Sequence, residues 1–126
     1  MSLRSPLGRV LGLGTAKDGT AHWWAQRVTG VALVLLGLWF AVSVATLPSL
    51  DYDDVVSFVA ELPNPVLLML LCVTMAYHSY LGVQVVIEDY VHGHGLKIFS
   101  LILSRFAHVF FAVVGVFAIL RLGIGS

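Results

Sequence analysis

The chain has 126 residues, of which 59% are hydrophobic and 11% are charged, with seven basic and seven acidic side chains. Soluble domains carry about 25% charged residues, so this composition, with a mean hydropathy of +0.94, indicates a membrane protein. The length allows one compact unit over residues 1–126, and the absence of a basic block argues against nucleic acid as a partner. The single cysteine, Cys72, excludes an internal disulfide and a cysteine-held cluster, and we interpret it as a small packing residue.

Residues 1–27 form the segment before the first apolar stretch. This segment contains four Lys or Arg residues but no apolar core of the kind that a signal peptide has. Its glycines predict that it is flexible, or ordered only against a partner. Trp23 and Trp24 near its end are typical of anchors at a membrane interface. We therefore expect the first apolar helix to direct membrane insertion.

Three stretches are long and apolar enough to cross a membrane, and they lie at about 28–47, 66–87 and 96–122. Twenty helical residues reach about 30 Å, which is the thickness of the hydrocarbon core. The acidic residues 51–61 predict a short surface helix, Pro65 suits the first turn of the second span, and residues 92–95 break the chain before the third. The predicted fold is an all-α membrane protein with one transmembrane unit over residues 28–122.

The distribution of basic residues predicts the orientation of these spans. Four Lys or Arg residues precede the first span, whereas the loop after it has four carboxylates and no basic residue. The second loop contains Lys97, with Arg105 nearby, and the C-terminal end has only Arg121. Since Lys and Arg are enriched in cytoplasmic loops, we expect a cytoplasmic N-terminus and a periplasmic C-terminus.

His78 lies near the middle of an apolar run that contains no charged residue between positions 62 and 87. A polar ring at this depth is costly unless it faces a partner inside the membrane. Imidazole is a common axial ligand of heme iron, which makes His78 a candidate ligand. The alternative is a hydrogen bond to a Ser, a Thr or a backbone carbonyl of a neighbouring helix.

The helical face of His78 also carries Gly82, one turn away, and Asp89, at the end of the span and next to Tyr90. Gly82 would leave room for a flat macrocycle, although it would equally allow close packing of another helix. Asp89 and Tyr90 form a polar group at the membrane surface, but they also suit a solvated carboxylate and an interfacial aromatic residue. Together these features favour a metal ligand over a packing histidine at position 78.

Other polar residues allow two interpretations each. Arg27 could bind a carboxylate such as Asp89 or an anionic cofactor group, or it could be an ordinary basic anchor. Arg105 and His108 share a helix face and could meet cofactor carboxylates, but we favour an Arg105 side chain that extends to the cytoplasmic interface. Elsewhere, Gly30 and Gly37 suggest close helix packing, and the loop residues His92 and His94 are interpreted as solvated.

Two segments resemble a known family. The stretch His78-Ser-Tyr-Leu-Gly82-Val-Gln-Val-Val-Ile-Glu-Asp89-Tyr90 is similar to the His-x3-Gly-x6-Asp-Tyr signature of the membrane anchor subunit of succinate dehydrogenase, respiratory complex II. The stretch His22-Trp-Trp-Ala-Gln-Arg27-Val-Thr-Gly30 resembles the N-terminal entry of the same subunit. The resemblance extends over nearly the whole chain, because length and the number of spans also match.

The resemblance implies a role for individual residues. His78 matches the axial ligand of heme b, whose opposite ligand comes from a companion cytochrome b membrane subunit. Tyr90 matches a tyrosine that hydrogen-bonds a quinone, either ubiquinone or menaquinone, and Asp89 matches the acid beside that site. Arg27 matches, more loosely, an arginine near the heme propionates and the quinone.

The resemblance also implies partners and a location. The chain would anchor flavoprotein and iron–sulfur subunits and would be inert by itself, since it has no flavin motif and no cysteine framework. Anchoring a quinol:fumarate reductase is an alternative, as is a non-redox structural role in a membrane assembly. A bacterial inner membrane is expected, with the mitochondrial inner membrane as the alternative.

Overall fold

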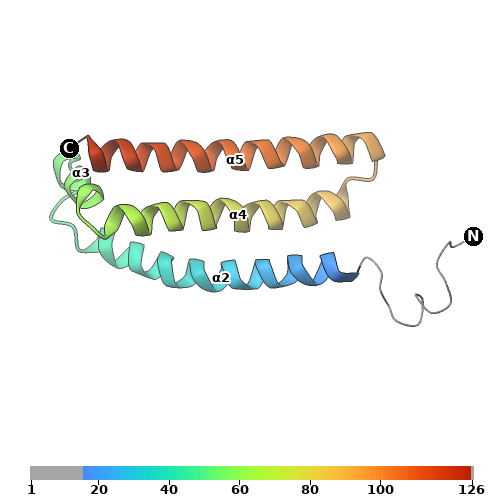
Figure 1. The fold of residues 1–126 in the computed structure, drawn as a ribbon, viewed down its shortest axis with the longest axis horizontal. Helices are drawn as coiled ribbons and strands as arrows, with labels where there is room; N and C mark the ends of the chain where they lie inside the picture. Colours follow the sequence, from blue (N-terminus) through green and yellow to red (C-terminus); the bar gives the residue numbers. More distant parts are fainter. Residues whose placement is uncertain (1–15, 126) are drawn as a thin grey trace, which may run out of the picture.

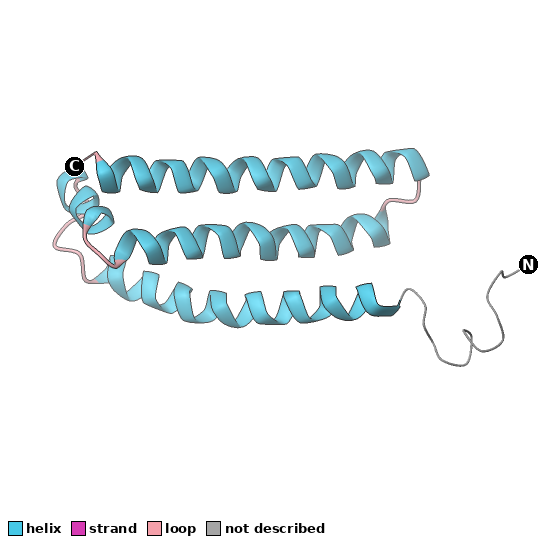
Figure 2. Cartoon of the chain, viewed as in Figure 1, coloured by secondary structure: helices cyan, strands magenta, loops and turns pink. Residues whose placement is uncertain are grey.

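The computed structural model describes residues 16–125, which form helices joined by short loops (Figures 1 and 2). Their bounds are α2 Ala16–Ala45, α3 Tyr52–Ala60, α4 Asn64–Tyr90 and α5 His94–Ile124. The segments Gly19–Ala45, Asn64–Tyr90 and His94–Ile124 are long and apolar enough to cross a membrane. The prediction of an all-α protein with three such helices is therefore confirmed.

The helices extend beyond the predicted spans, most clearly at the start of α2. Residues 16–27 are helical and continue directly into the apolar stretch, so the expectation of a flexible segment there was wrong. Its glycine at position 19 does not interrupt the helix, because one glycine costs only about 1 kcal/mol in a helix interior. The earlier residues of that predicted segment, 1–15, lie outside the described residues.

The short helix α3 confirms the prediction for residues 51–61. Asp53 and Asp54 lie in its first turn, where carboxylates interact favourably with the helix dipole. Ser49 donates a hydrogen bond to Oδ2 of Asp54 at 2.6 Å, which ties the preceding loop to the helix. At the other end, Nδ2 of Asn64 donates to the carbonyl of Phe58 at 2.8 Å and fixes the start of α4. Helix α3 is thus held across the ends of the long helices.

The break between α4 and α5 is shorter than predicted. Only residues 91–93 are non-helical, and His94 and Gly95 already belong to the first turn of α5. Pro65 lies in the first turn of α4, as expected. The short connection makes α4 and α5 antiparallel neighbours along their length.

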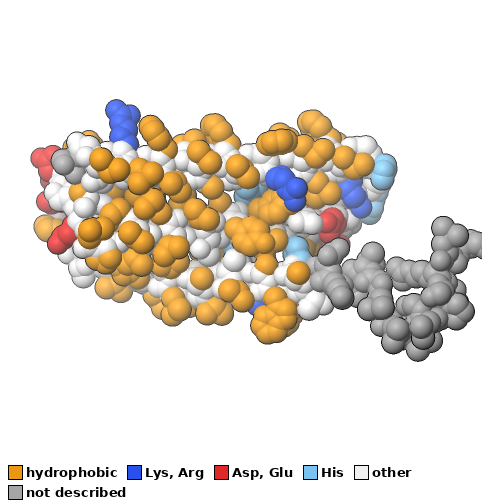
Figure 3. Space-filling model, viewed as in Figure 1, with side chains coloured by type: hydrophobic (Ala, Val, Ile, Leu, Met, Phe, Trp, Pro, Cys, Tyr) orange, Lys and Arg blue, Asp and Glu red, His pale blue; other side chains and the backbone are white. Residues whose placement is uncertain are grey.

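The three long helices lie side by side in a single layer, with α4 between α2 and α5 (Figure 1). Within residues 16–125, α2 and α5 make no contact with each other, while α3 contacts both α4 and α5. Only Val59 and Leu81 are buried among the described side chains, and hydrophobic side chains cover the visible face (Figure 3). This arrangement leaves both broad faces of the layer for lipid or for other subunits.

Helices α4 and α5 pack closely at Gly115. A Cβ atom at this position would overlap Sγ of Cys72, whereas a Cβ at Gly95 or Gly37 would meet nothing within 4 Å. The thiol of Cys72 points to the carbonyl of Ala112, with 3.9 Å between sulfur and oxygen. The interpretation of Cys72 as a packing residue therefore agrees with its position. The expected packing role of Gly37 is not fulfilled within the described part of the chain.

Candidate functional site

The His78 ring lies between α4 and α2 and is engaged through both of its nitrogens. Nδ1 is 2.9 Å from Oγ1 of Thr29, and Nε2 is 3.4 Å from Nε2 of Gln26. A Cβ atom at Gly30 would stand 3.5 Å from Cε1 of His78, so the glycine lets the ring approach the backbone of α2. The ring is half-buried and faces a helix of its own chain. This is the interhelical hydrogen bond that the sequence allowed as an alternative to a ligand.

The hydrogen-bond partners of Thr29 indicate which nitrogen of His78 carries the proton. The Thr29 hydroxyl has one proton, and it donates this proton to the carbonyl of Ala25 at 2.6 Å. Oγ1 can therefore only accept from His78, which places a proton on Nδ1. Nε2 is then left with a lone pair, toward which the amide of Gln26 donates. In this tautomer, the unprotonated nitrogen is the one that a metal ion would bind.

The space beside Gly82 is taken up by the Gln26 side chain. A Cβ atom at Gly82 would lie 3.8 Å from Nε2 of Gln26. Oε1 of Gln26 and Nε2 of His22 are both buried without a hydrogen-bond partner. Buried polar atoms are nearly always paired in native proteins, so unpaired ones require an explanation. The Gln26 side chain lies against the His78 ring, and His22 precedes Gln26 by one turn on the same face of α2.

These residues fit a heme b group on three counts. The second nitrogen of a metal-bound imidazole is usually held by a hydrogen bond, as Nδ1 of His78 is held by Thr29. The lone pair on Nε2 of His78 accepts a hydrogen bond from the side-chain amide of Gln26, which can rotate away. Gly82 leaves room that only this amide fills. The described residues contain no group of three or more His, Cys, Asp or Glu side chains that could hold a metal ion by themselves.

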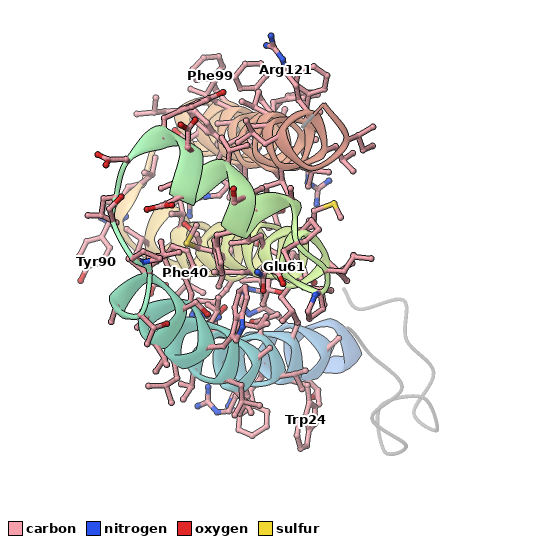
Figure 4. All side chains as sticks on the ribbon, turned by 90° about the vertical axis from the view of Figure 1, so that its left-hand side faces the viewer. Trp24, Phe40, Glu61, Tyr90, Phe99 and Arg121 are labelled. Carbon is pink, nitrogen blue, oxygen red and sulfur yellow. The ribbon has the colours of Figure 1, made fainter. Side chains whose placement is uncertain are left out.

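The other predicted site residues lie apart from the His78 ring. Tyr90 is 77% exposed and projects from one broad face of the helix layer (Figure 4). Asp89 is exposed as well. The guanidinium of Arg27 lies 4.4 Å above the ring of Trp23 and is exposed. Among the described residues no ion pair joins Arg27 to Asp89, so the contact that the sequence allowed between these two residues is not formed there.

The tryptophans at the start of the first apolar stretch have the geometry of an interfacial anchor. Trp23 and Trp24 form an edge-to-face pair with 5.1 Å between ring centroids, and both are exposed. Trp24 points away from α4 (Figure 4). With Arg27 over Trp23, this end of α2 presents aromatic rings and one positive charge outward, as residues at a membrane surface do.

Arg105 and His108 belong to a second polar group, between α4 and α5. Nε and Nη2 of Arg105 donate to the hydroxyl of Tyr80 at 3.2 and 3.0 Å. Nδ1 of His108 donates to the carbonyl of Ser104 at 2.7 Å, and its Nε2 is 3.1 Å from the hydroxyl of Ser79. Both nitrogens of His108 are thus engaged within the chain, so this histidine bridges two helices. His92 in the loop and His94 in the first turn of α5 are both exposed, as predicted.

Comparison with known proteins places the chain in a family. A family model described as the succinate dehydrogenase/fumarate reductase transmembrane subunit matches residues 1–120. The chain belongs to this family. The resemblance indicated by the motif from His78 to Tyr90 is therefore confirmed for the chain as a whole.

Several curated relatives are membrane anchor subunits of succinate dehydrogenase. The hydrophobic membrane anchor subunit from Rickettsia conorii is 39% identical over 85 residues, covering 67% of this chain and 68% of the relative. The subunit of the same name from Rickettsia bellii is 33% identical over 94 residues and covers 75% of each chain. That from Paracoccus denitrificans is 33% identical over 128 residues, covering 97% of this anchor chain and 94% of the relative.

Two residues of α2 that contact the His78 ring, Gln26 and Thr29, were not predicted from the sequence, which pointed to Arg27 as the functional residue of that segment. The close helix packing expected at Gly30 is confirmed, because this glycine lies against the His78 ring. A signal was present, because His22, Gln26 and Thr29 repeat at helical spacing around the start of the apolar stretch. Such a polar face predicts a contact, but it does not say which helix provides the other side.

Proposed function

We propose that this anchor subunit binds heme b through His78 in a succinate:quinone oxidoreductase and contributes Tyr90 and Asp89 to the site where quinone is reduced. The observation that carries the proposal is the hydrogen bond between His78 and Thr29, because it leaves Nε2 as the unprotonated nitrogen. When bound, the heme would supply a one-electron carrier within the membrane. The chain's own residues hold the imidazole, fix its tautomer and orient it.

The opposite axial ligand, in this proposal, comes from a companion cytochrome b membrane subunit. Two features support such a partner. The helices form an open layer whose broad faces are not covered by residues 16–125. In addition, the buried atoms Oε1 of Gln26 and Nε2 of His22 lack hydrogen-bond partners in the described part of the chain. A heme propionate would offer an acceptor to Nε2 of His22 when that nitrogen carries the proton, whereas Oε1 of Gln26 needs a donor from another subunit. Arg27 lies on the same helix one residue after Gln26.

The proposed role of Tyr90 rests on its hydroxyl and its place at the end of α4. A phenol can donate a hydrogen bond to a quinone oxygen as that oxygen gains charge on reduction, which is where a donor stabilises most. Asp89 is an exposed carboxylate at the same helix end. In this proposal it orients the quinone pocket or relays protons to it. The flavoprotein and iron–sulfur subunits would dock on this side, which the basic residues predict to be cytoplasmic.

The decisive experiment compares two histidines that lie at similar depth. His78→Ala and His108→Ala are introduced into the assembled complex, and reduced-minus-oxidised spectra are recorded. We expect His78→Ala to abolish or strongly shift the b-type signal, whereas His108→Ala leaves it in place because His108 is bonded to Ser104 and Ser79. An unchanged spectrum in His78→Ala would contradict heme ligation and would favour a purely structural histidine.

The family description also includes fumarate reductase, so the direction of catalysis is a separate question. We propose succinate oxidation, because the curated relatives compared above are named for succinate dehydrogenase. Measuring succinate oxidation and fumarate reduction with the same purified complex tests this choice. If the complex reduced fumarate with a quinol donor faster than it oxidised succinate, the chain would be the anchor of a quinol:fumarate reductase.

A further inference from the structure

Three adjoining hollows run along the outside of the α4–α5 pair. The first, of about 210 Å³, is lined by Tyr80, Gln84 and Arg105 among others. The second, of about 410 Å³, shares Tyr80 and Arg105 with the first and is almost entirely apolar. The third, of about 330 Å³, shares Val73 and Ala112 with the second and is also apolar. Because neighbouring hollows share lining residues, they form one groove with a polar end and a long apolar part, here called the α4–α5 groove.

The α4–α5 groove is separate from the His78 site. On α4, Ala76 and Tyr80 line the groove, and each lies about 160° around the helix from His78. His78 faces α2, whereas the groove opens between α4 and α5. A ligand in the groove would therefore not compete with a group bound to His78.

The polar end of the groove carries a positive charge without a carboxylate partner. Among the described residues Arg105 forms no ion pair, and its guanidinium is held by the hydroxyl of Tyr80. The nearest anionic side chain on α4, Glu88, does not line the groove. It accepts a hydrogen bond from Gln84 at 2.9 Å, and its backbone carbonyl accepts one from Lys97. A fixed cation at the edge of an apolar groove favours an anionic group on an apolar ligand.

The backbone of Arg105 lies about 9 Å inside the edge of the hydrocarbon layer if α5 is centred in the bilayer. Helix α5 has 31 residues and is therefore about 45 Å long, which equals the full bilayer with its headgroup regions. Arg105 lies about 16 Å from the start of α5, and helical side chains tilt toward the N-terminus, here toward the α4–α5 loop. A long arginine side chain reaches the polar boundary from this depth. Figure 3 shows basic side chains among hydrophobic ones on the α4–α5 side, toward the loop.

The apolar part of the groove is longer than half of the hydrocarbon core, so it has room for one acyl chain along its length. From Arg105 to Leu120, the last groove residue on α5, the helix rises about 22 Å, while half of the hydrocarbon core measures about 15 Å. We propose that the α4–α5 groove is a binding site for an anionic diacyl phospholipid, with its phosphate on Arg105 and an acyl chain along the second and third hollows. A zwitterionic lipid fits less well, because its own cation would lie near Arg105.

The test uses the assembled complex and two lipids with the same acyl chains, phosphatidylglycerol and phosphatidylcholine. Lipid-stripped complex is titrated with each lipid, and the bound lipid is counted by native mass spectrometry. We expect one tightly bound phosphatidylglycerol, and we expect Arg105→Gln to weaken this binding about tenfold. Arg105→Lys should retain most of the binding. The matched control is Arg121→Gln, which removes an exposed charge at the other end of the same helix.

A second variant blocks the groove without touching the charge. Ala76→Phe should fill the largest hollow and release the lipid while assembly, followed by size-exclusion chromatography, is retained. Equal binding of the two lipids, or no effect of Arg105→Gln, would overturn the proposal. A photo-reactive amino acid in place of Val109 identifies the occupant in membranes. Cross-linking to phospholipid is the expected result, and cross-linking to a companion polypeptide or to quinone would overturn it.

Discussion

At the scale of single residues, Thr29 and Gln26 determine which nitrogen of His78 carries the proton. The Thr29 hydroxyl donates a hydrogen bond to the carbonyl of Ala25 on its own helix and accepts one from Nδ1 of His78. A hydrogen bond of this kind is worth about 1 kcal/mol net, but its larger effect is to select one tautomer. If heme is bound, the same hydrogen bond makes the imidazole a stronger electron donor to iron.

Replacing the Thr29 hydroxyl tests this electronic effect. Thr29→Val keeps the shape of the side chain and removes the acceptor for Nδ1 of His78, so the imidazole becomes a poorer donor and the oxidised heme is less stabilised. We expect the heme midpoint potential to rise by up to about 40 mV, the equivalent of a 1 kcal/mol hydrogen bond for one electron. The measurement is a potentiometric titration of the b-type absorbance.

The control for this variant is Thr46→Val. Thr46 donates to carbonyls of its own helix, as Thr29 does, but it contacts no histidine. Its replacement should leave the potential unchanged. A fall in potential in Thr29→Val, or an equal change in both variants, would contradict the assigned tautomer.

The proposed role of Tyr90 gives a second prediction at this scale. Tyr90→Phe removes only the hydroxyl, and a hydrogen bond to a group that gains charge is worth about 1.5–3 kcal/mol. We expect kcat for quinone reduction to fall roughly 10- to 100-fold, while electron transfer from succinate to a water-soluble dye is retained. Tyr52→Phe is the control, because Tyr52 is similarly exposed but belongs to helix α3, which lies at the other end of the helix layer. Full quinone activity in Tyr90→Phe would exclude the hydrogen bond.

At the scale of helices, hydropathy predicted the apolar core of each span but not where the helices end. The predicted span 28–47 and the observed α2 share their apolar residues, yet α2 begins at Ala16 because helical hydrogen bonding continues outside the hydrocarbon layer. The surface helix α3 was predictable from its acidic start and the proline-rich stretch after it. The faces that meet were not predictable, because nothing in a single sequence pairs Gln26 and Thr29 with His78.

The contact between α4 and α5 allows a double-mutant test. Gly115→Ala places a Cβ atom against Sγ of Cys72, so we expect a loss of about 1–3 kcal/mol in stability. Gly95→Ala, in the first turn of the same helix, meets open space and should be neutral or stabilising by up to about 1 kcal/mol. Thermal unfolding of the purified complex measures both effects.

Removing the opposing sulfur distinguishes steric overlap from other causes. The double variant Gly115→Ala with Cys72→Ala should recover most of the stability lost in Gly115→Ala, because the two positions are coupled directly. Additive losses in the double variant would show that the Gly115–Cys72 approach does not limit the packing of α4 on α5.

At the scale of the whole molecule, the open helix layer explains why this chain has almost no core of its own. Lipid tails are as apolar as leucine, so membrane helices associate through close packing and polar contacts rather than by burying apolar surface from water. The contacts of His78 with α2 and of His108 with α4 are of this kind. The remaining surface is covered by lipid or by partner subunits, which fits a protein that acts as part of a complex.

The orientation of the layer is predicted from its charges and can be measured directly. In a Cys72→Ser background, Leu50→Cys lies in the loop before α3 and His92→Cys in the loop before α5, and both positions are exposed. We expect a membrane-impermeant maleimide to label Leu50→Cys in cells whose outer membrane is permeabilised, and His92→Cys only after lysis. The opposite pattern would place the N-terminus outside and remove Tyr90 from the cytoplasmic side.

Both hydrogen-bond partners of the His78 ring lie on α2, which enters the bilayer before the helix that carries the ring. The third long helix contributes nothing to this hydrogen bonding. During synthesis, the imidazole can therefore adopt its tautomer and its resting position as soon as α2 and α4 have paired, while the rest of the polypeptide is still being made. If heme binds to His78 as proposed, the Gln26 amide would have to move aside in a pair of helices that has already formed.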